Sequence, residues 1–123
     1  MDNKEISGHV VNAAMKVHSA LGPGLLESAY EACMVHELRK RGLRVEAQVP
    51  MPIVYDGARI DIGYRLDLLV EERVIVELKA VAKVLLIHQA QLLSYLKLGE
   101  FPVGLLLNFH VSRMRDGIMR FAN

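Results

Sequence analysis

Hydrophobic residues recur every three or four positions at the start of the chain, which is the spacing of an amphipathic helix. The pattern is carried by Ile6, Val10, Ala14, Val17 and Leu21. Gly22-Pro23-Gly24 ends it, because neither residue type continues a helix readily. A second helix is predicted over residues 25–41, since Gly42 follows a basic last turn and suits a left-handed cap.

From residue 44 the hydrophobic period changes to two, which predicts strands. Strands are expected over residues 45–55, with prolines at 50 and 52, and over 60–70, 74–80 and 103–109. Asp56-Gly57 is a strong signal for a tight hairpin. Residues 85–98 have the length and composition of a helix. Residues 112–121 are expected to fold about Asp116-Gly117 as a terminal hairpin.

The resulting order is helix, helix, three strands, helix, strand, strand. It predicts an α/β sandwich with a mixed central sheet, in which the helix at 85–98 is a right-handed crossover between parallel strands. A chain of 123 residues has the usual size of one domain, so we expect a single domain over residues 1–123.

Composition narrows the classes of function. The chain has no apolar run near the roughly 18 residues of a membrane-spanning helix and no secretory signal pattern, so we expect a soluble cytoplasmic protein without membrane association. The single cysteine, Cys33, excludes an internal disulfide. A net charge of +1 excludes a large positive field, so any nucleic-acid binding has to be local.

The most informative residues are two carboxylates on the predicted hairpin around residue 72. A three-residue loop at 71–73 would place Asp67 directly opposite Glu77, whereas a two-residue loop would put them on opposite faces. The three-residue loop is favoured because it pairs apolar residues with one another: Val70 with Val74, Leu68 with Val76 and Leu66 with Leu78.

Two opposed carboxylates repel each other unless a cation lies between them. A diagonal salt bridge from Lys79, on the same face as Glu77, to Asp67 is one solution. A divalent ion held by both carboxylates, with Lys79 beside it, is the other. Magnesium prefers oxygen ligands and would polarise a bound phosphodiester. The spacing alone leaves both alternatives open.

Two other places carry candidate residues. Glu27 is in the first turn of the second helix, either as a third carboxylate or as a favourable charge at the helix N-terminus. Tyr30 is on the same face one turn further on, where it could equally be a half-buried helix aromatic. Gln91 and Tyr95 are four residues apart and share a helix face, where they could hold a phosphate or a base, or form a solvated polar stripe.

Several short segments in a fixed order carry a family resemblance. They are Gly24-Leu25-Leu26-Glu27-Ser28-Ala29-Tyr30, Asp67–Val70, Val76–Ala80, Gln91–Lys97 and Gly104–Phe109. Together they resemble the GxxExxY family, which is placed in the PD-(D/E)XK nuclease superfamily, over residues 5–121. The resemblance implies a restriction-endonuclease-like α/β sandwich with a central mixed sheet flanked by helices. Leu66 stands where the superfamily name has proline.

The resemblance also implies a metal-dependent phosphodiesterase site. By position, its residues would be Glu27, Asp67, Glu77 and Lys79. The Leu78 carbonyl would add a ligand for Mg²⁺ or Mn²⁺, and Lys79 would orient the attacking water. Gln91 and Tyr95 match the Gln-X-X-X-Tyr pattern of RecB-type nucleases. With Tyr30, they are the candidate substrate-binding residues.

We therefore expect a magnesium-dependent nuclease-like domain acting on DNA, with RNA as the less favoured substrate. The alternative is a non-catalytic nucleic-acid- or protein-binding module that retains the nuclease fold. Near-neutral charge favours that alternative, because a small chain has little surface with which to grip a duplex. A homodimer would double the footprint.

Overall fold

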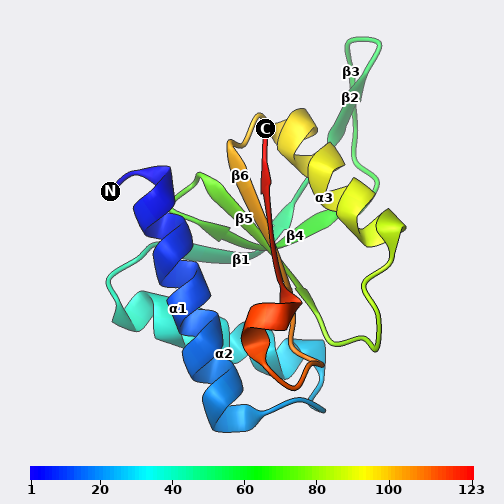
Figure 1. Ribbon diagram of the computed structural model, residues 1–123. Coiled ribbons are helices and arrows are strands. Elements are labelled where there is room, and N and C mark those ends of the chain that lie inside the picture. Colours follow the sequence, from blue (N-terminus) through cyan, green and yellow to red (C-terminus); the bar gives the residue numbers. More distant parts are fainter.

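Five strands form one central sheet in the order β1-β4-β5-β6-β7 (Figure 1). The computed structural model describes residues 1–123. The strands of this sheet are β1 (Val45–Pro50), β4 (Arg65–Val70), β5 (Val74–Lys79), β6 (Val103–Asn108) and β7 (Ile118–Ala122). Only β5 and β6 are parallel. The sheet is therefore mixed, as expected.

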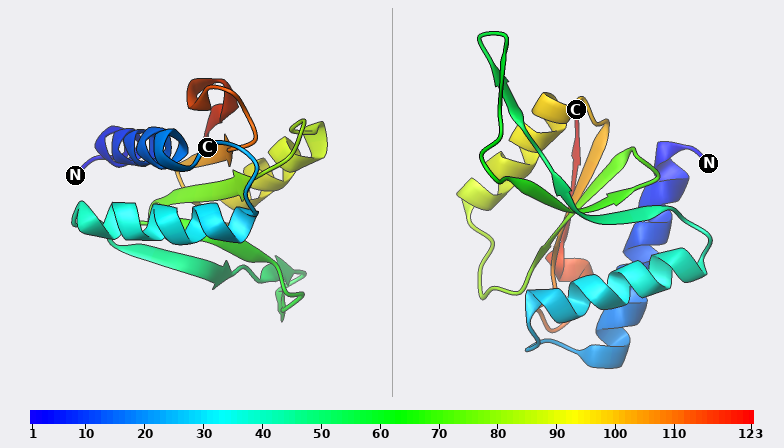
Figure 2. Two further views of the ribbon diagram at one scale, coloured as in Figure 1. Left: turned by 90° about the horizontal axis from the view of Figure 1, so that it is seen from below. Right: turned by 180° about the vertical axis from the view of Figure 1, so that it is seen from behind.

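Helices cover both faces of the sheet. α1 (Asn3–Leu21) and α2 (Glu27–Lys40) lie on one face, and α3 (Leu86–Gly99) lies on the other (Figure 2). The larger hydrophobic core fills the α1/α2 side, and a smaller core that includes Leu92 and Leu96 lies under α3. The expected α/β sandwich and the α3 crossover between β5 and β6 are confirmed. None of the helices is both long and apolar enough to cross a bilayer.

The predicted turn at Asp56-Gly57 is also confirmed. It joins β2 (Ile53–Tyr55) to β3 (Ala58–Ile60), and these form a separate two-stranded sheet. We call residues 53–64 the arm. In Figure 1 the arm projects from the body of the protein beside α3.

Three predicted strands differ from the structure. The strand expected over 45–55 is divided at residues 51–52, next to the two prolines, into β1 and β2, which belong to different sheets. The strand expected over 60–70 is broken, because Gly63 takes a left-handed conformation (φ 80°) and β4 begins only at Arg65. Residues 112–121 form no hairpin of their own. Met114–Gly117 is a short 3₁₀ helix, η1, and β7 pairs with the edge of β6. This pairing gives β6 the partner it would otherwise lack on that side.

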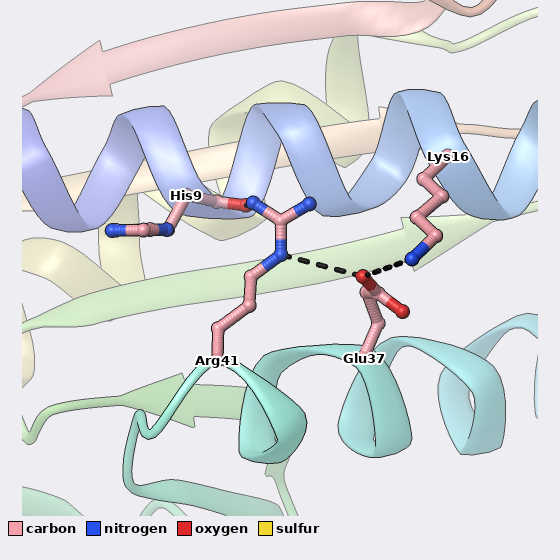
Figure 3. Close-up of polar contacts among 4 residues, drawn as sticks. All are labelled: His9, Lys16, Glu37 and Arg41. Carbon is pink, nitrogen blue, oxygen red and sulfur yellow. Dashed lines mark hydrogen bonds and ion pairs between the residues drawn. The ribbon is translucent and has the colours of Figure 1, made fainter.

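A buried carboxylate ties α1 to α2. Glu37 on α2 pairs with Lys16 Nζ of α1 at 3.1 Å and with Arg41 Nε at 3.4 Å (Figure 3). Arg41 also donates from Nη1 to the His9 carbonyl at 3.5 Å. The hydrogen bond from Lys16 is the main cause that lowers the pKa of Glu37, against the opposing effect of burial. The two helices are thereby held at a fixed distance from one another.

Tyr30 fixes the loop between these two helices. Its side chain is fully buried, and its ring stacks on Phe109 with 4.4 Å between centroids. Its hydroxyl donates to the Gly22 carbonyl at 2.6 Å and accepts from the Leu25 backbone nitrogen at 3.1 Å. Because α2 starts just after this loop, Tyr30 determines where Glu27 lies.

Tyr30→Phe is expected to lower the free energy of unfolding by about 1–2 kcal/mol, because Gly22 and Leu25 each lose a buried hydrogen-bond partner. Urea unfolding measures the change. Tyr55→Phe is the matched control, because that ring is 71% exposed and should contribute little. Equal stability of the two variants would contradict this role for Tyr30.

Candidate active site

Strands β4 and β5 separate before either ends, and Asp67 lies where they part. Their ladder stops at the pair Leu68–Val76. Beyond that pair β4 stays bonded to β1, and β5 stays bonded to β6. Asp67 Oδ2 accepts a hydrogen bond from the Leu78 backbone nitrogen at 2.8 Å. A carboxylate oxygen thus replaces the missing strand partner.

This fork changes one pairing that the sequence predicted. The register of the hairpin is as expected, because Val70 pairs with Val74 across residues 71–73. Leu66 and Leu78 do not face each other, however. Leu66 belongs to the core under α3, and Leu78 belongs to the core under α1 and α2. Past the fork each strand follows its other neighbour, so the expected apolar contact is wrong.

The ladder on the other side of Asp67 is also interrupted. Gln48 of β1 stands opposite Asp67, and it is not paired although the residues on either side of it are. Its φ of 54° is left-handed, which is uncommon for any residue other than glycine. Its side-chain amide donates from Nε2 to Glu31 Oε1 at 2.7 Å. Strained backbone of this kind costs about 1–3 kcal/mol and is concentrated at functional sites.

Glu77 has the most strongly shifted pKa in the protein. It is only 7% exposed, and its buried Oε1 has no hydrogen-bond partner. Burial, followed by the negative charge of Asp67, raises the pKa of Glu77 to about 9. At neutral pH and without a cation, Glu77 is therefore protonated.

Lys79 does not neutralise these carboxyl groups. The ion pairs of the structure all lie elsewhere, and none joins Lys79 to Asp67 or Glu77 within 4 Å. The diagonal Asp67–Lys79 bridge considered from the sequence is absent. Lys79 ends β5, two residues beyond Glu77, and is partly buried. Asp67 and Glu77 therefore lie close together without an ion pair, and the charge of Lys79 is only the smallest of the causes that act on the pKa of Glu77.

Glu27 and Asp67 share a pocket of about 160 Å³ between α2 and the sheet. Its lining consists of Glu27, Ser28, Glu31, Gln48, Asp67 and Leu78. No side chain caps the N-terminus of α2 by a hydrogen bond, so Glu27 is not held in a capping role. Glu77 and Lys79 do not line this pocket. Asp67 is thus the residue common to the pocket and to the buried acid pair.

The donor set fits a hard divalent cation in its chemistry. Glu27, Asp67 and Glu77 offer only oxygen atoms, which Mg²⁺ and Ca²⁺ prefer, and the unpartnered Glu77 Oε1 is an acceptor that a cation would satisfy. No group of three His, Cys, Asp or Glu side chains lies close enough to hold a metal ion as the protein stands. The structure therefore brings the acids together in pairs around Asp67.

The two residues predicted on α3 lie on the other side of the sheet. Gln91, Ser94 and Tyr95 line a groove of about 290 Å³ between α3 and the arm. Tyr95 meets Tyr64 of the arm edge to face, with 6.1 Å between centroids. Burial, and then the nearby Glu77 carboxyl, raise the pKa of Tyr95. Tyr95 therefore lies close to the acid pair, whereas Gln91 is exposed.

Several residues of these pockets were not identified from the sequence, among them Glu31, Gln48 and Tyr64. Glu31 follows Glu27 by one helical turn, and that spacing was the available signal. The sequence carried no signal for Gln48 or Tyr64, because their places in the pockets depend on where β4 begins and where the β4–β5 ladder ends. Tyr30, expected among the substrate-binding residues, is fully buried and lines none of the pockets described. It influences the site through the loop before Glu27.

The mixed five-stranded sheet with helices on both faces, and with Asp67 where β4 and β5 part, is the α/β sandwich expected from the sequence. A family model described as the PD-(D/E)XK nuclease superfamily matches residues 4–121. The chain belongs to this superfamily, and its fold is restriction-endonuclease-like. No curated protein and no solved structure gave a significant match.

The Glu77 carboxyl should make the protein less stable as the pH rises. Its folded pKa of about 9 lies above the ordinary value of 4.5, so its contribution is complete below pH 4.5 and is lost through pH 9. Within that window the free energy of unfolding should fall by up to about 1.4 kcal/mol per pH unit.

Urea unfolding between pH 5 and 9 measures this slope. Glu77→Gln should abolish it, because the amide cannot ionise, whereas Glu27→Gln at the exposed edge of the pocket should keep it. A slope that is the same in wild type and Glu77→Gln would show that another group causes the pH dependence.

Proposed function

We propose that this chain hydrolyses phosphodiester bonds in a metal-dependent reaction, with DNA as the favoured substrate and RNA as the less favoured one. The buried Glu77 carboxyl beside Asp67 carries the proposal. An acid buried without a partner costs stability, and a second acid beside it adds to that cost. A cation bound between the two carboxyl groups during function would offset this cost.

Glu27, Asp67 and Glu77, with the Leu78 carbonyl, would hold Mg²⁺ or Mn²⁺. Such an ion, when bound, polarises a phosphoryl oxygen and lowers the pKa of a coordinated water. The chain would respond in two ways: Glu77 would release its proton, and the carboxylates would draw closer together than they are now. Asp67 needs the least adjustment, because Leu78 already orients it.

Lys79 and two residues of α3 would act on the substrate. Lys79 is not engaged in an ion pair, so its ammonium group is available to orient the attacking water and to stabilise the charge that develops on phosphorus oxygens. Tyr95 and Gln91 would position the substrate backbone. Tyr95 lies close to Glu77, and Gln91 is one helical turn before Tyr95 on α3. Tyr30 would keep Glu27 in place.

Within the superfamily we assign the chain to the GxxExxY branch. The support is the segment Gly24–Tyr30, in which Gly24, Glu27 and Tyr30 stand at the spacing of that name. We also propose that two copies of the chain pair, which would double the surface available to nucleic acid.

The competing function is a binding module that retains the nuclease fold. The observation in its favour is that no three acids are gathered closely enough to hold an ion. The two functions differ in what magnesium does to the protein, and that difference can be measured without a substrate.

Magnesium is expected to raise the melting temperature of the wild type. A ligand that binds only the folded state adds about 2.7 kcal/mol at a hundredfold excess over its Kd. Asp67→Asn should lose this increment. Without magnesium the variant should melt at or above the wild-type temperature. The amide oxygen can still accept from Leu78, and loss of the Asp67 charge lowers the pKa of Glu77, which can only reduce the cost of keeping Glu77 protonated at neutral pH. Destabilised Asp67→Asn, with no magnesium effect on the wild type, would favour the binding module.

The wild type should cleave DNA in magnesium or manganese. Chelation of the metal, Asp67→Asn and Lys79→Ala should each reduce the rate by at least about a hundredfold, the usual effect of losing one group that stabilises transition-state charge. Lys83→Ala is the matched control, because Lys83 is an exposed lysine on the loop after β5. A wild type that is inert on single- and double-stranded DNA and RNA with either ion would contradict the proposal.

A further inference from the structure

Most of the exposed apolar side chains of this protein are gathered on one surface. Ten of the fifteen large hydrophobic side chains that remain exposed come from the arm and from α3 with its preceding residue. They are Val54, Tyr55, Ile60, Ile62, Tyr64, Leu85, Leu86, Ile87, Leu93 and Leu98. We call these ten residues the arm–helix surface.

The arm and α3 lie side by side, and apolar residues of both meet in one groove. Ile53 and Tyr64 of the arm line the same groove as Ile87 and Leu98 of α3. Figure 1 and the right view of Figure 2 show the arm beside α3 and extending beyond the body of the protein. A partner that contacts one element would therefore contact the other.

α3 carries exposed apolar residues outside the side that faces the core, where an amphipathic surface helix normally carries polar ones. Leu92 and Leu96 face the core and are buried. On the other side Leu86 is 82% exposed, and Ile87 and Leu93 are exposed as well. The sheet therefore covers only one side of α3 in the isolated chain.

The arm also has groups that lack a partner in the isolated chain. β2 and β3 are three residues long and form a sheet of only two strands, so each has an edge without a partner. An isolated two-stranded hairpin is marginally stable in water. Contact with a second surface would stabilise it.

We propose that the arm–helix surface binds a second copy of this chain in a twofold dimer. Its size is appropriate: at on the order of 80 Å² for each half-exposed side chain, the surface offers roughly the 800 Å² that each partner buries in a standard interface. The largest apolar patch of an ordinary monomer is smaller, at about 300–600 Å².

Charge favours a second copy over a charged partner. α3 carries one lysine, Lys97, as its only Lys, Arg, Asp or Glu. On the arm, Arg59 and Asp61 pair with each other at 3.1 Å, which leaves Asp56 at the turn. Two identical faces can therefore meet without the repulsion that like charges would cause.

Sedimentation equilibrium of the full chain tests the proposal. The wild type should be a dimer at micromolar concentrations, and Leu86→Glu and Tyr55→Glu should each raise the dimer Kd by at least about thirtyfold, as for a central contact. Met15→Glu is the control, because Met15 is 39% exposed on α1, away from this surface. Circular dichroism checks that all three variants remain folded.

Hydrogen exchange gives an independent measurement. Amides of the arm should exchange more slowly as the protein concentration rises, and Leu86→Glu should remove this dependence. Asp67→Asn should dimerise like the wild type, because the inference does not require phosphodiesterase activity. A protein that dimerises but does not cleave nucleic acid would therefore contradict the proposed function and not the dimer.

A wild type that is monomeric at every concentration would overturn the proposal. So would equal weakening by Leu86→Glu and Met15→Glu. A monomer that binds phosphatidylcholine vesicles through Leu86 would also overturn it, and would assign the surface to a lipid.

Discussion

The fork between β4 and β5 is the constraint on which the rest of the site depends. β5 is bonded to β6 along its whole length, but it is bonded to β4 only as far as Val76. The Leu78 amide is then left without a strand partner, and a buried amide without an acceptor is costly. Asp67 supplies the acceptor. Its carboxylate is thus held by the fold before any ligand arrives.

This structural role of Asp67 explains the strain around it. The pKa of Glu77 is raised mainly by burial, and the charge of the Asp67 carboxylate, which is held at the fork, raises it further. Gln48, opposite Asp67 on β1, takes a left-handed conformation and leaves the ladder. The strand pairing at Gln48 and the close approach of Asp67 and Glu77 are both unfavourable, and they occur at the same position in the sheet. Proteins commonly accept such a loss of stability at a functional site.

The sequence predicted what depends on local pattern and missed what depends on distant strands. The register of the hairpin followed from matching Val70 with Val74, and the parallel β5–β6 pair followed from a helix between two strands. The fork could not be foreseen, because it arises where β1 and β6 draw β4 and β5 apart. The sequence allowed for a half-buried Tyr30 but not for its full burial, because its ring stacks on Phe109, which is far away in the chain.

The acidity of the pocket has a further consequence for how a nucleic acid could bind. Glu27, Glu31 and Asp67 all line it, and no lysine or arginine does. A phosphodiester approaching within a few ångströms would meet like charge, which costs on the order of 1–4 kcal/mol per pair at the effective dielectric constants of a protein surface. A cation in the pocket reverses that sign. Binding of phosphate at this place and binding of metal are therefore coupled, and a module that binds nucleic acid without metal would have to use another surface.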